Sequence, residues 1–281
     1  MPNAVALPPI QRLNVQGVEV QIEGQGTETL LMLHGWPDTL ALWNDTVQAL
    51  RTTHRCVRLT LPAFDANAPL PPKSLIEMVA FIDEVVQQVS PDQPITLVLH
   101  DWGCIFGYEY AAVHPHRVGR MVAVDVGDHN SRALYASWQA KAKWGVFSYQ
   151  IWLAIAWQLV NVFGNIARPL ANRMTRYMAK ALRCPSALAD MHVGMNVPYA
   201  MKWMGTLEGF ELACNALKIL PAARPMLYIY GKRKPFMFHS DRWLEKIAAH
   251  PGSRVEGFDT GHWVMSNKPE QFNALLKEWL A

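Results

Sequence analysis

One aspartate stands where a buried strand is expected to run directly into a helix. The segment 97–103 (LVLHDWG) begins inside the apolar run Ile95–Leu99 and precedes a helical pattern over Ile105–Val113. A continuous apolar run is typical of a parallel strand that is buried on both faces. A sharp turn between such a strand and a helix presents one reactive side chain at the edge of the sheet, and Gly103 lets the helix pack closely. The pattern predicts that Asp101 is that reactive residue.

A carboxylate at this turn limits the chemistry that the turn can support. A carboxylate does not form the usual acyl-enzyme with an ester, but it can attack a saturated carbon and form a covalent alkyl ester. An aspartate before a helix is also a common helix cap. The nucleophile interpretation of Asp101 therefore depends on partners elsewhere in the chain.

Two further loops supply the groups that such a reaction needs. The segment 31–38 (LMLHGWPD) follows an expected strand, so the backbone N–H groups of Trp36 and Trp102 are predicted to form an anion hole. The segment 260–263 (TGHW) also follows an expected strand, and His262 is predicted to be the general base that activates water. Two histidines adjoining these motifs are supporting candidates, His34 and His100.

The elements that must position these loops alternate between strands and helices. Such alternation predicts an α/β fold with a mostly parallel, doubly wound sheet. From about Asp128 the pattern becomes helical throughout, which predicts a helical cap inserted above the carboxyl ends of the strands, where ligands bind in open sheets. We therefore expect a core over 1–127, a cap over 128–220 and the rest of the core over 221–281. The expected strands are Val18–Ile22, Leu30–Leu33, Cys56–Leu61, Ile95–Leu99, Met121–Val126, Met226–Tyr230 and Ser253–Phe258.

The order His-Gly, Asp, His resembles the α/β-hydrolase superfamily, in the branch that holds epoxide hydrolases and haloalkane dehalogenases. The resemblance spans nearly the whole chain apart from the cap. It implies the α/β-hydrolase fold, with Asp101 as the nucleophile, His262 as the base, and Trp36 and Trp102 at the oxyanion or halide positions. It implies no metal and no organic cofactor.

The acid that would orient His262 is not where this family often places it. The loop after the expected strand Met226–Tyr230 reads GKRK and carries Lys234 at the acid position, where a lysine is expected to disturb His262. Some family members carry the acid at the end of the strand before the cap. A carboxylate is needed to hold the imidazole tautomer and stabilise its cation. We expect Asp125 in this role, with Asp128 as the alternative.

The reaction stays open between two chemistries. An epoxide hydrolase needs hydroxyls that protonate the opening ring, and the expected cap holds four tyrosines: Tyr135, Tyr149, Tyr177 and Tyr199. A haloalkane dehalogenase needs a second halide donor, a position filled here by Trp36. We expect an epoxide hydrolase that acts on a small apolar substrate. A haloalkane dehalogenase, or a ligand-binding protein with weakened catalysis, is the alternative.

Composition excludes several other classes of protein. With 51% apolar and 17% charged residues in 281, the chain can bury a large core, which excludes disordered and disulfide-scaffold classes. A net charge of +3, with no block of five or six like charges, argues against a nucleic-acid partner. The four cysteines form no CxxC pair and no zinc-site spacing. No signal-peptide pattern is visible, so we expect a cytoplasmic protein, with a homodimer possible.

One uncharged segment, 144–167, is long enough to cross a bilayer. Four amides lie in one narrow stripe of the helix that it predicts, namely Gln150, Gln158, Asn161 and Asn165. A lipid-facing span rarely carries so many amides. We therefore expect a helix whose broad apolar face packs on the rest of the protein, and no membrane partner.

Overall fold

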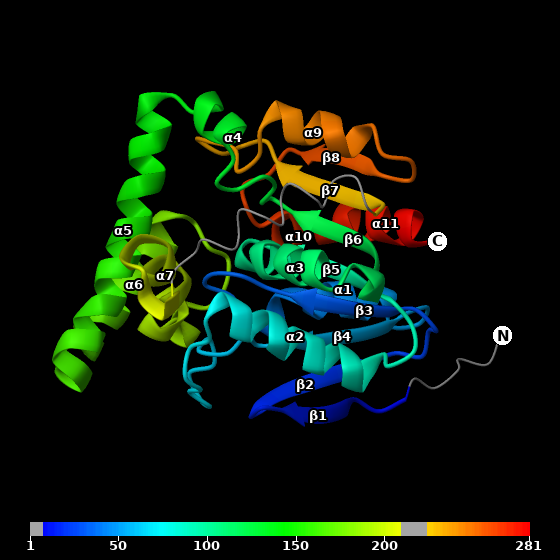
Figure 1. Ribbon diagram of the computed structural model, residues 1–281, viewed down its shortest axis with the longest axis horizontal. Coiled ribbons are helices and arrows are strands. Elements are labelled where there is room, and N and C mark those ends of the chain that lie inside the picture. The colour runs from blue at the N-terminus through cyan, green and yellow to red at the C-terminus, as the bar shows by residue number, and fades with distance from the viewer. Residues whose placement is uncertain (1–7, 209–223) are drawn as a thin grey trace.

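The centre of the protein is an eight-stranded sheet with the strand order β1-β2-β4-β3-β5-β6-β7-β8 (Figure 1). The computed structural model describes residues 8–208 and 224–281. The β1–β2 and β2–β4 pairs are antiparallel, and the other pairs are parallel. The strands are β1 (Gln11–Val15), β2 (Val18–Glu23), β3 (Thr29–Leu33), β4 (Arg55–Leu59), β5 (Ile95–His100), β6 (Val118–Val124), β7 (Met226–Gly231) and β8 (Arg254–Phe258). The predicted mostly parallel sheet is confirmed.

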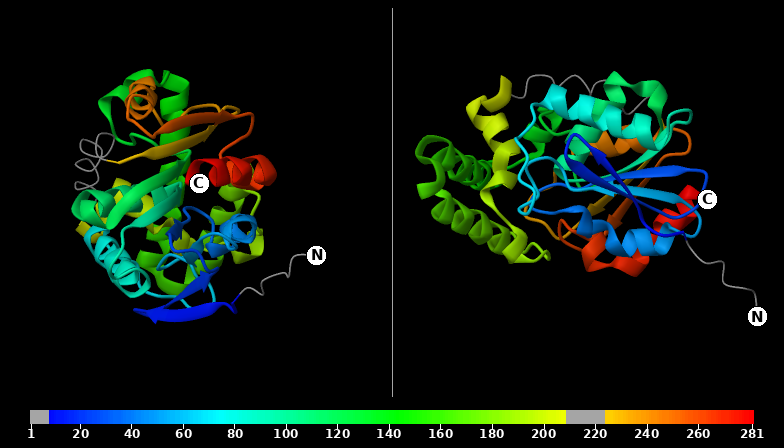
Figure 2. Two further views of the ribbon diagram at one scale, coloured as in Figure 1. Left: turned by 90° about the vertical axis from the view of Figure 1, so that its right-hand side faces the viewer. Right: turned by 90° about the horizontal axis from the view of Figure 1, so that it is seen from below.

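Helices cover both faces of this sheet (Figure 2). One face packs on α2 (Leu75–Val89), α3 (Trp102–Val113) and α9 (Asp241–Ala248). The other packs on α1 (Asn44–Leu50), α10 (Val264–Asn267) and α11 (Pro269–Leu280). Successive β3 side chains alternate between the two cores and are all buried, as expected for a strand covered on both sides.

Local sequence signals place several helix ends. Ser74 and Glu77 form a capping box at the start of α2: the Ser74 hydroxyl accepts from the Glu77 N–H, and the Glu77 carboxylate accepts from the Ser74 N–H. The helix ends at Val89, two residues before Pro91. The helix predicted over Ile105–Val113 begins earlier, at Trp102, because the turn at Asp101 leads into it without a linker.

The strand β1 was not predicted from the sequence. Its five residues, Gln11–Val15, include only two apolar side chains, and three of the five are exposed. This strand lies at the edge of the sheet and pairs only with β2, so it buries too little apolar surface to leave a clear pattern.

Between β6 and residue 208, the chain forms a helical layer beyond the carboxyl ends of the central strands (Figure 1). Its helices are α4 (Arg132–Ser137), α5 (Ala140–Phe163), α6 (Arg168–Ala181) and α7 (Val197–Met204). The last part of the expected cap, 209–220, and Cys214 lie outside the described residues.

The amide stripe predicted over 144–167 faces outward only in part, because Asn161 and Asn165 are exposed as expected but Gln150 is not. Gln150 is buried; its amide donates to the Tyr149 hydroxyl, and its carbonyl accepts from the Trp203 indole. Large apolar side chains are exposed as well, including Trp144 and Phe163. Hydrogen bonds to two aromatic side chains satisfy the polar groups of Gln150 at this buried position.

Candidate active site

Asp101 lies at the carboxyl end of β5, between the strand and α3. Its backbone has φ 52° and ψ −121°, a strained conformation for a residue other than glycine. Two glycines make the close packing here possible. A Cβ at Gly35 would collide with the Asp101 carboxylate and with the Trp102 nitrogen, and a Cβ at Gly103 would collide with the backbone of β3.

Two backbone amides hold the Asp101 carboxylate. The Trp36 N–H donates to Oδ1 at 2.7 Å, and the Trp102 N–H also donates to this side chain. Burial opposes the charged form, but hydrogen bonds and the nearby His262 outweigh it, so the pKa of Asp101 lies below its ordinary value. The carboxylate is therefore ionised at neutral pH. The structure brings together the two amides that the sequence analysis named.

The His262 ring lies between two carboxylates. Its Nε2 is 3.4 Å from Asp101 Oδ2, and its Nδ1 donates to Asp125 Oδ2. Burial alone would lower the pKa of His262, but these two negative charges raise it to about 9. His262 is therefore protonated while both carboxylates are ionised.

Asp125 immediately follows β6 and is fully buried. Its Oδ2 accepts from His262, while its Oδ1 accepts the Gly231 N–H at 3.0 Å and pairs with Lys234. Despite burial, which raises it, the pKa of Asp125 falls to about 2, chiefly because of the Lys234 and His262 charges. Lys234 does not displace His262 from Asp125, contrary to expectation, because Lys234 binds the oxygen that His262 does not use.

The other candidate acid has a different position. Asp128 accepts the backbone N–H and the hydroxyl of Ser240 at 2.8 and 2.6 Å, and also the Ser131 hydroxyl at 2.6 Å. These contacts anchor the entry to the cap on the start of α9. Among the described contacts of Asp128, none reaches His262, so the structure brings Asp125 and not Asp128 to the imidazole.

The two supporting histidines are buried next to the site. His34 Nδ1 donates to the Gly35 carbonyl and its Nε2 accepts the Leu61 N–H, both at 3.0 Å. The His100 ring lies 4.6 Å from the His262 ring, centre to centre. Burial lowers the pKa of His34 to about 4 and that of His100 to about 3, so both side chains are uncharged at neutral pH.

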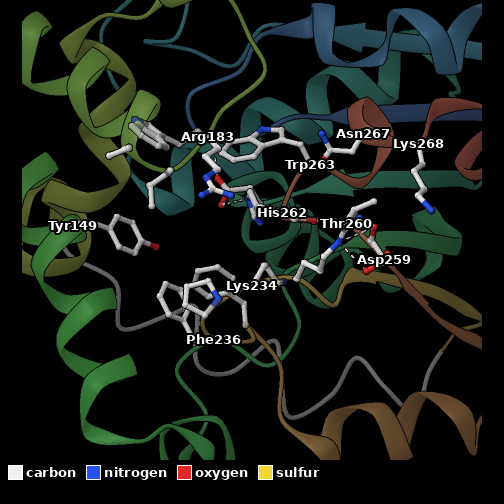
Figure 3. A pocket seen from close by; sticks show the side chains of 18 of the residues that line it. Tyr149, Arg183, Lys234, Phe236, Asp259, Thr260, His262, Trp263, Asn267 and Lys268 are labelled. Atoms are coloured by element: carbon white, nitrogen blue, oxygen red, sulfur yellow. Dashed lines mark hydrogen bonds and ion pairs between the residues drawn. The ribbon is translucent and has the colours of Figure 1, made fainter.

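A cavity of about 750 Å³ lies above Asp101 and His262. Tyr149 of α5 and Tyr199 of α7 line it, and Figure 3 shows the Tyr149 hydroxyl pointing into it. Burial raises the pKa of both phenols, so they keep their protons. The other two candidate tyrosines are not in the cavity lining: Tyr135 is 39% exposed and donates to Asn130, and Tyr177 is 62% exposed.

The sequence analysis gave no role to Asp38, the last residue of the segment 31–38. This buried carboxylate accepts the Trp263 indole N–H at 2.9 Å and the Ser186 hydroxyl, so it joins the loop of His262 to the loop after α6. Burial raises its pKa to about 6. The Pro-Asp turn was the only signal in the sequence, and it says nothing about contacts 148 and 225 residues away.

The arrangement can perform covalent catalysis on a carbon electrophile. Asp101 Oδ1 accepts the Trp36 amide, the Trp102 amide also donates to this carboxylate, and His262 Nε2 lies 3.4 Å from Oδ2, so a nucleophile, an anion hole and a base are within reach of one another. Within residues 8–208 and 224–281, no group of three or more His, Cys, Asp or Glu side chains is placed to hold a metal ion.

This chain belongs to the α/β-hydrolase family: residues 28–269 match the family described as alpha/beta hydrolase fold. The chain is 32% identical to a cis-3-alkyl-4-alkyloxetan-2-one decarboxylase of Shewanella oneidensis, over 92% of this chain and 83% of the relative.

Two solved enzyme structures show the same fold. Epoxide hydrolase A from Mycobacterium thermoresistibile superimposes with a TM-score of 0.63 at 17% identity, covering 97% of this chain and 98% of the other. A haloalkane dehalogenase DbeA loop variant from Bradyrhizobium elkanii has a TM-score of 0.66 at 15% identity, covering 96% of each chain. The family match over residues 28–269 and the 32% identity to the decarboxylase confirm the expected superfamily and its enzymatic character.

Proposed function

We propose that this chain is an epoxide hydrolase that works through an ester on Asp101 and acts on a small apolar substrate. The proposal rests on one observation. The Asp101 carboxylate, which two amides and His262 hold in place, borders the same cavity as Tyr149 and Tyr199. A carboxylate nucleophile and a protonated phenol are the two groups that opening an epoxide requires.

In the first step, Asp101 Oδ2 attacks a ring carbon and the carbon–oxygen bond of the ring breaks. The resulting alkoxide takes a proton from one of the two tyrosines. The ester that forms is neutral, so His262 loses the attraction of one carboxylate and its pKa falls. His262 then gives its proton to the tyrosinate, which restores the tyrosine and leaves His262 as a neutral base.

In the second step, neutral His262 takes a proton from water and the hydroxide attacks Cγ of Asp101. The Trp36 and Trp102 amides stabilise the negative charge that develops on Oδ1. Collapse of this intermediate releases the diol, which takes its second proton from His262. The remaining water proton passes from the Asp101 carboxyl to His262, which restores the resting charges, and one water oxygen stays in Asp101.

The retained oxygen gives a direct test. In a single turnover of styrene oxide in heavy-oxygen water, the peptide that contains Asp101 gains one heavy oxygen atom. The label is absent in an Asp101→Asn variant that does not turn over. A diol formed while the Asp101 peptide stays unlabelled would overturn the covalent route.

A second candidate is the opening of a β-lactone, favoured by the similarity to the oxetan-2-one decarboxylase over 92% of the chain. Asp101 would displace the ring oxygen from the saturated carbon and leave a free carboxylate. Loss of carbon dioxide with departure of Asp101 would then give an alkene. This route needs no water, so His262→Gln would stop diol release from an epoxide but leave alkene release from a cis-3,4-dialkyl β-lactone.

The remaining alternatives have less support. The Trp36 indole donates to Asn196 at 2.9 Å, and the Trp102 indole is hydrogen-bonded to Tyr199, so both indole N–H groups that a halide would need are engaged. The weakened-catalysis alternative arose from Lys234, whose pairing with Asp125 leaves His262 oriented. A cytoplasmic location, a homodimer and the absence of a nucleic-acid partner stay predictions.

A further inference from the structure

The cap presents an unusually apolar outer surface. We define the cap apolar face by six side chains: Trp144, Phe147, Trp152, Ile155 and Phe163 of α5, and Tyr177 of α6. Each is between 38% and 69% exposed. The Trp152 and Tyr177 rings lie 5.9 Å apart, which makes the surfaces of the two helices continuous. Figure 1 shows α5 at the outer edge of the cap, on the side away from the sheet.

Packing fixes which side of α5 faces outward. Gln150, Leu153, Ala154 and Ala156 are buried on its inner side, where α5 contacts α6 and α7. Among the described residues, Ala140–Ile166 is the one helical segment long and apolar enough to cross a membrane, with a mean hydropathy of 1.3. A transmembrane position would break these contacts, whereas a position along a lipid surface keeps them.

Charge around this face is strongly one-sided. Residues 129–189 hold eight basic residues and no Asp or Glu, although the whole chain has a net charge of only +3. All eight are exposed. The rest of the chain therefore carries a net negative charge. The basic residues are Arg132, Lys141, Lys143, Arg168, Arg173, Arg176, Lys180 and Arg183.

We propose that the cap apolar face docks on the surface of a bilayer that contains anionic phospholipid. Tryptophan and tyrosine side chains favour the boundary between headgroups and acyl chains. Exposed lysine and arginine beside an apolar helix face add attraction to anionic headgroups. The proposal replaces the expectation of no membrane partner, and it does not depend on the reaction assigned to Asp101.

The same charge argues against a second copy as the occupant. A two-fold dimer buries the same patch on both subunits. Pairing two cap apolar faces would bring together two copies of the segment 129–189, which carries basic residues and no acidic residue to compensate them. An anionic surface satisfies both the apolar and the basic groups.

Docking would place the cavity near the source of an apolar substrate. Tyr149 of α5 and the end of α6, at Ala181 and Leu182, form part of the cavity wall. The helices that contact lipid would therefore also border the reaction site, so a substrate dissolved in acyl chains would have a short path to it.

The test measures co-sedimentation of the full chain with vesicles of phosphatidylcholine alone or mixed equally with phosphatidylglycerol. We expect binding to the mixed vesicles that weakens as salt is raised. Arg173→Gln with Lys180→Gln should reduce that binding about tenfold. Trp144→Gln with Phe163→Gln should reduce it by a similar factor at every salt concentration.

Matched controls change two basic and two apolar residues on helices outside the cap. Lys246→Gln with Lys277→Gln, and Ile76→Gln with Val113→Gln, should bind as the parent does; all four positions are exposed and lie on α9, α11, α2 and α3. Absence of binding, equal loss in the controls, or a dimer in sedimentation velocity that the Trp144 and Phe163 changes dissociate would overturn the proposal.

Discussion

Lys234 Nζ binds Oδ1 of Asp125, the carboxylate oxygen that His262 leaves free. Burial lowers the pKa of Lys234, whereas the contact with Asp125 raises it. Because one carboxylate serves both a cation and an imidazole, Lys234 moderates the pull of Asp125 on the proton of His262. Within the described residues, this pairing lets a lysine occupy the family's usual acid position without loss of the His262–Asp125 contact.

Removing this lysine should shift the pH dependence of turnover. In Lys234→Met, the charge of Asp125 is less compensated, so the pKa of His262 in the ester intermediate rises. Ester hydrolysis needs neutral His262, so the acid limb of the kcat profile should move upward by about one pH unit. Lys232→Met is the matched control, because Lys232 is exposed and lies two residues away. An unmoved profile would contradict the moderating role.

Replacing the base should trap the intermediate. In His262→Gln, attack by Asp101 proceeds, but hydrolysis of the ester loses its general base and kcat falls about 10³-fold. Intact-protein mass spectrometry should then show one substrate adduct per chain, and the adduct should be absent in the double variant with Asp101→Asn. Loss of activity without any adduct would place His262 in the first step instead.

The two candidate acids should respond differently to the same change. Asp125→Asn removes the charge that holds His262, so kcat should fall about 10³-fold or more with little change in KM. Asp128→Asn weakens the anchor on Ser240 and should lower the melting temperature while kcat stays near that of the parent. Steady-state kinetics and thermal unfolding of both variants check this, and similar kcat values would refute the assignment.

The tyrosines that line the cavity should contribute to epoxide opening, whereas the exposed tyrosines should not. Tyr149→Phe and Tyr199→Phe each remove a proton donor and should lower kcat/KM for styrene oxide, with the double variant down by about 10²-fold or more. Tyr135→Phe and Tyr177→Phe change the exposed tyrosines and should have no such effect. Full activity in the double variant would favour a substrate whose leaving group needs no proton.

Stability should fall as the pH drops below 6.5. The folded protein holds His34, His100, His129 and His239 with pKa values lowered by burial to about 3 or 4. Between 6.5 and about 4 the unfolded chain binds more protons, so the free energy of unfolding decreases as pH falls. Asp38, with a pKa raised to about 6, acts in the opposite direction but is a single group.

Urea unfolding across this pH range measures the effect. His100→Gln should flatten the decline by about 1.4 kcal/mol per pH unit, the value for one proton. His116→Gln, at an exposed position, should leave the slope unchanged. An identical slope in all three proteins would show that His100 gains no extra proton when the chain unfolds.

The sequence by itself determined the order of the elements and the three motif loops. The buried run before Asp101, the capping box at Ser74 and the His-Gly turn are local patterns, and each depends on residues that are near neighbours in the chain. Asp101, the Trp36 and Trp102 amides and His262 could be predicted to lie together because strand ends in a parallel sheet meet at one edge. The edge strand β1 was not predicted, because its residues carry no such local signal.

Only the tertiary structure decided which acid reaches His262, where Lys234 binds and which tyrosines face the cavity. The partners of the His262–Asp125 contact are 137 residues apart in the chain, and those of the Lys234–Asp125 contact are 109 apart. Packing against α6 and α7 likewise decided which side of α5 faces outward. On the packed side, Gln150 forms hydrogen bonds with Tyr149 and Trp203. Periodicity assigns residues to a helix face, but only the neighbouring elements decide which face is buried.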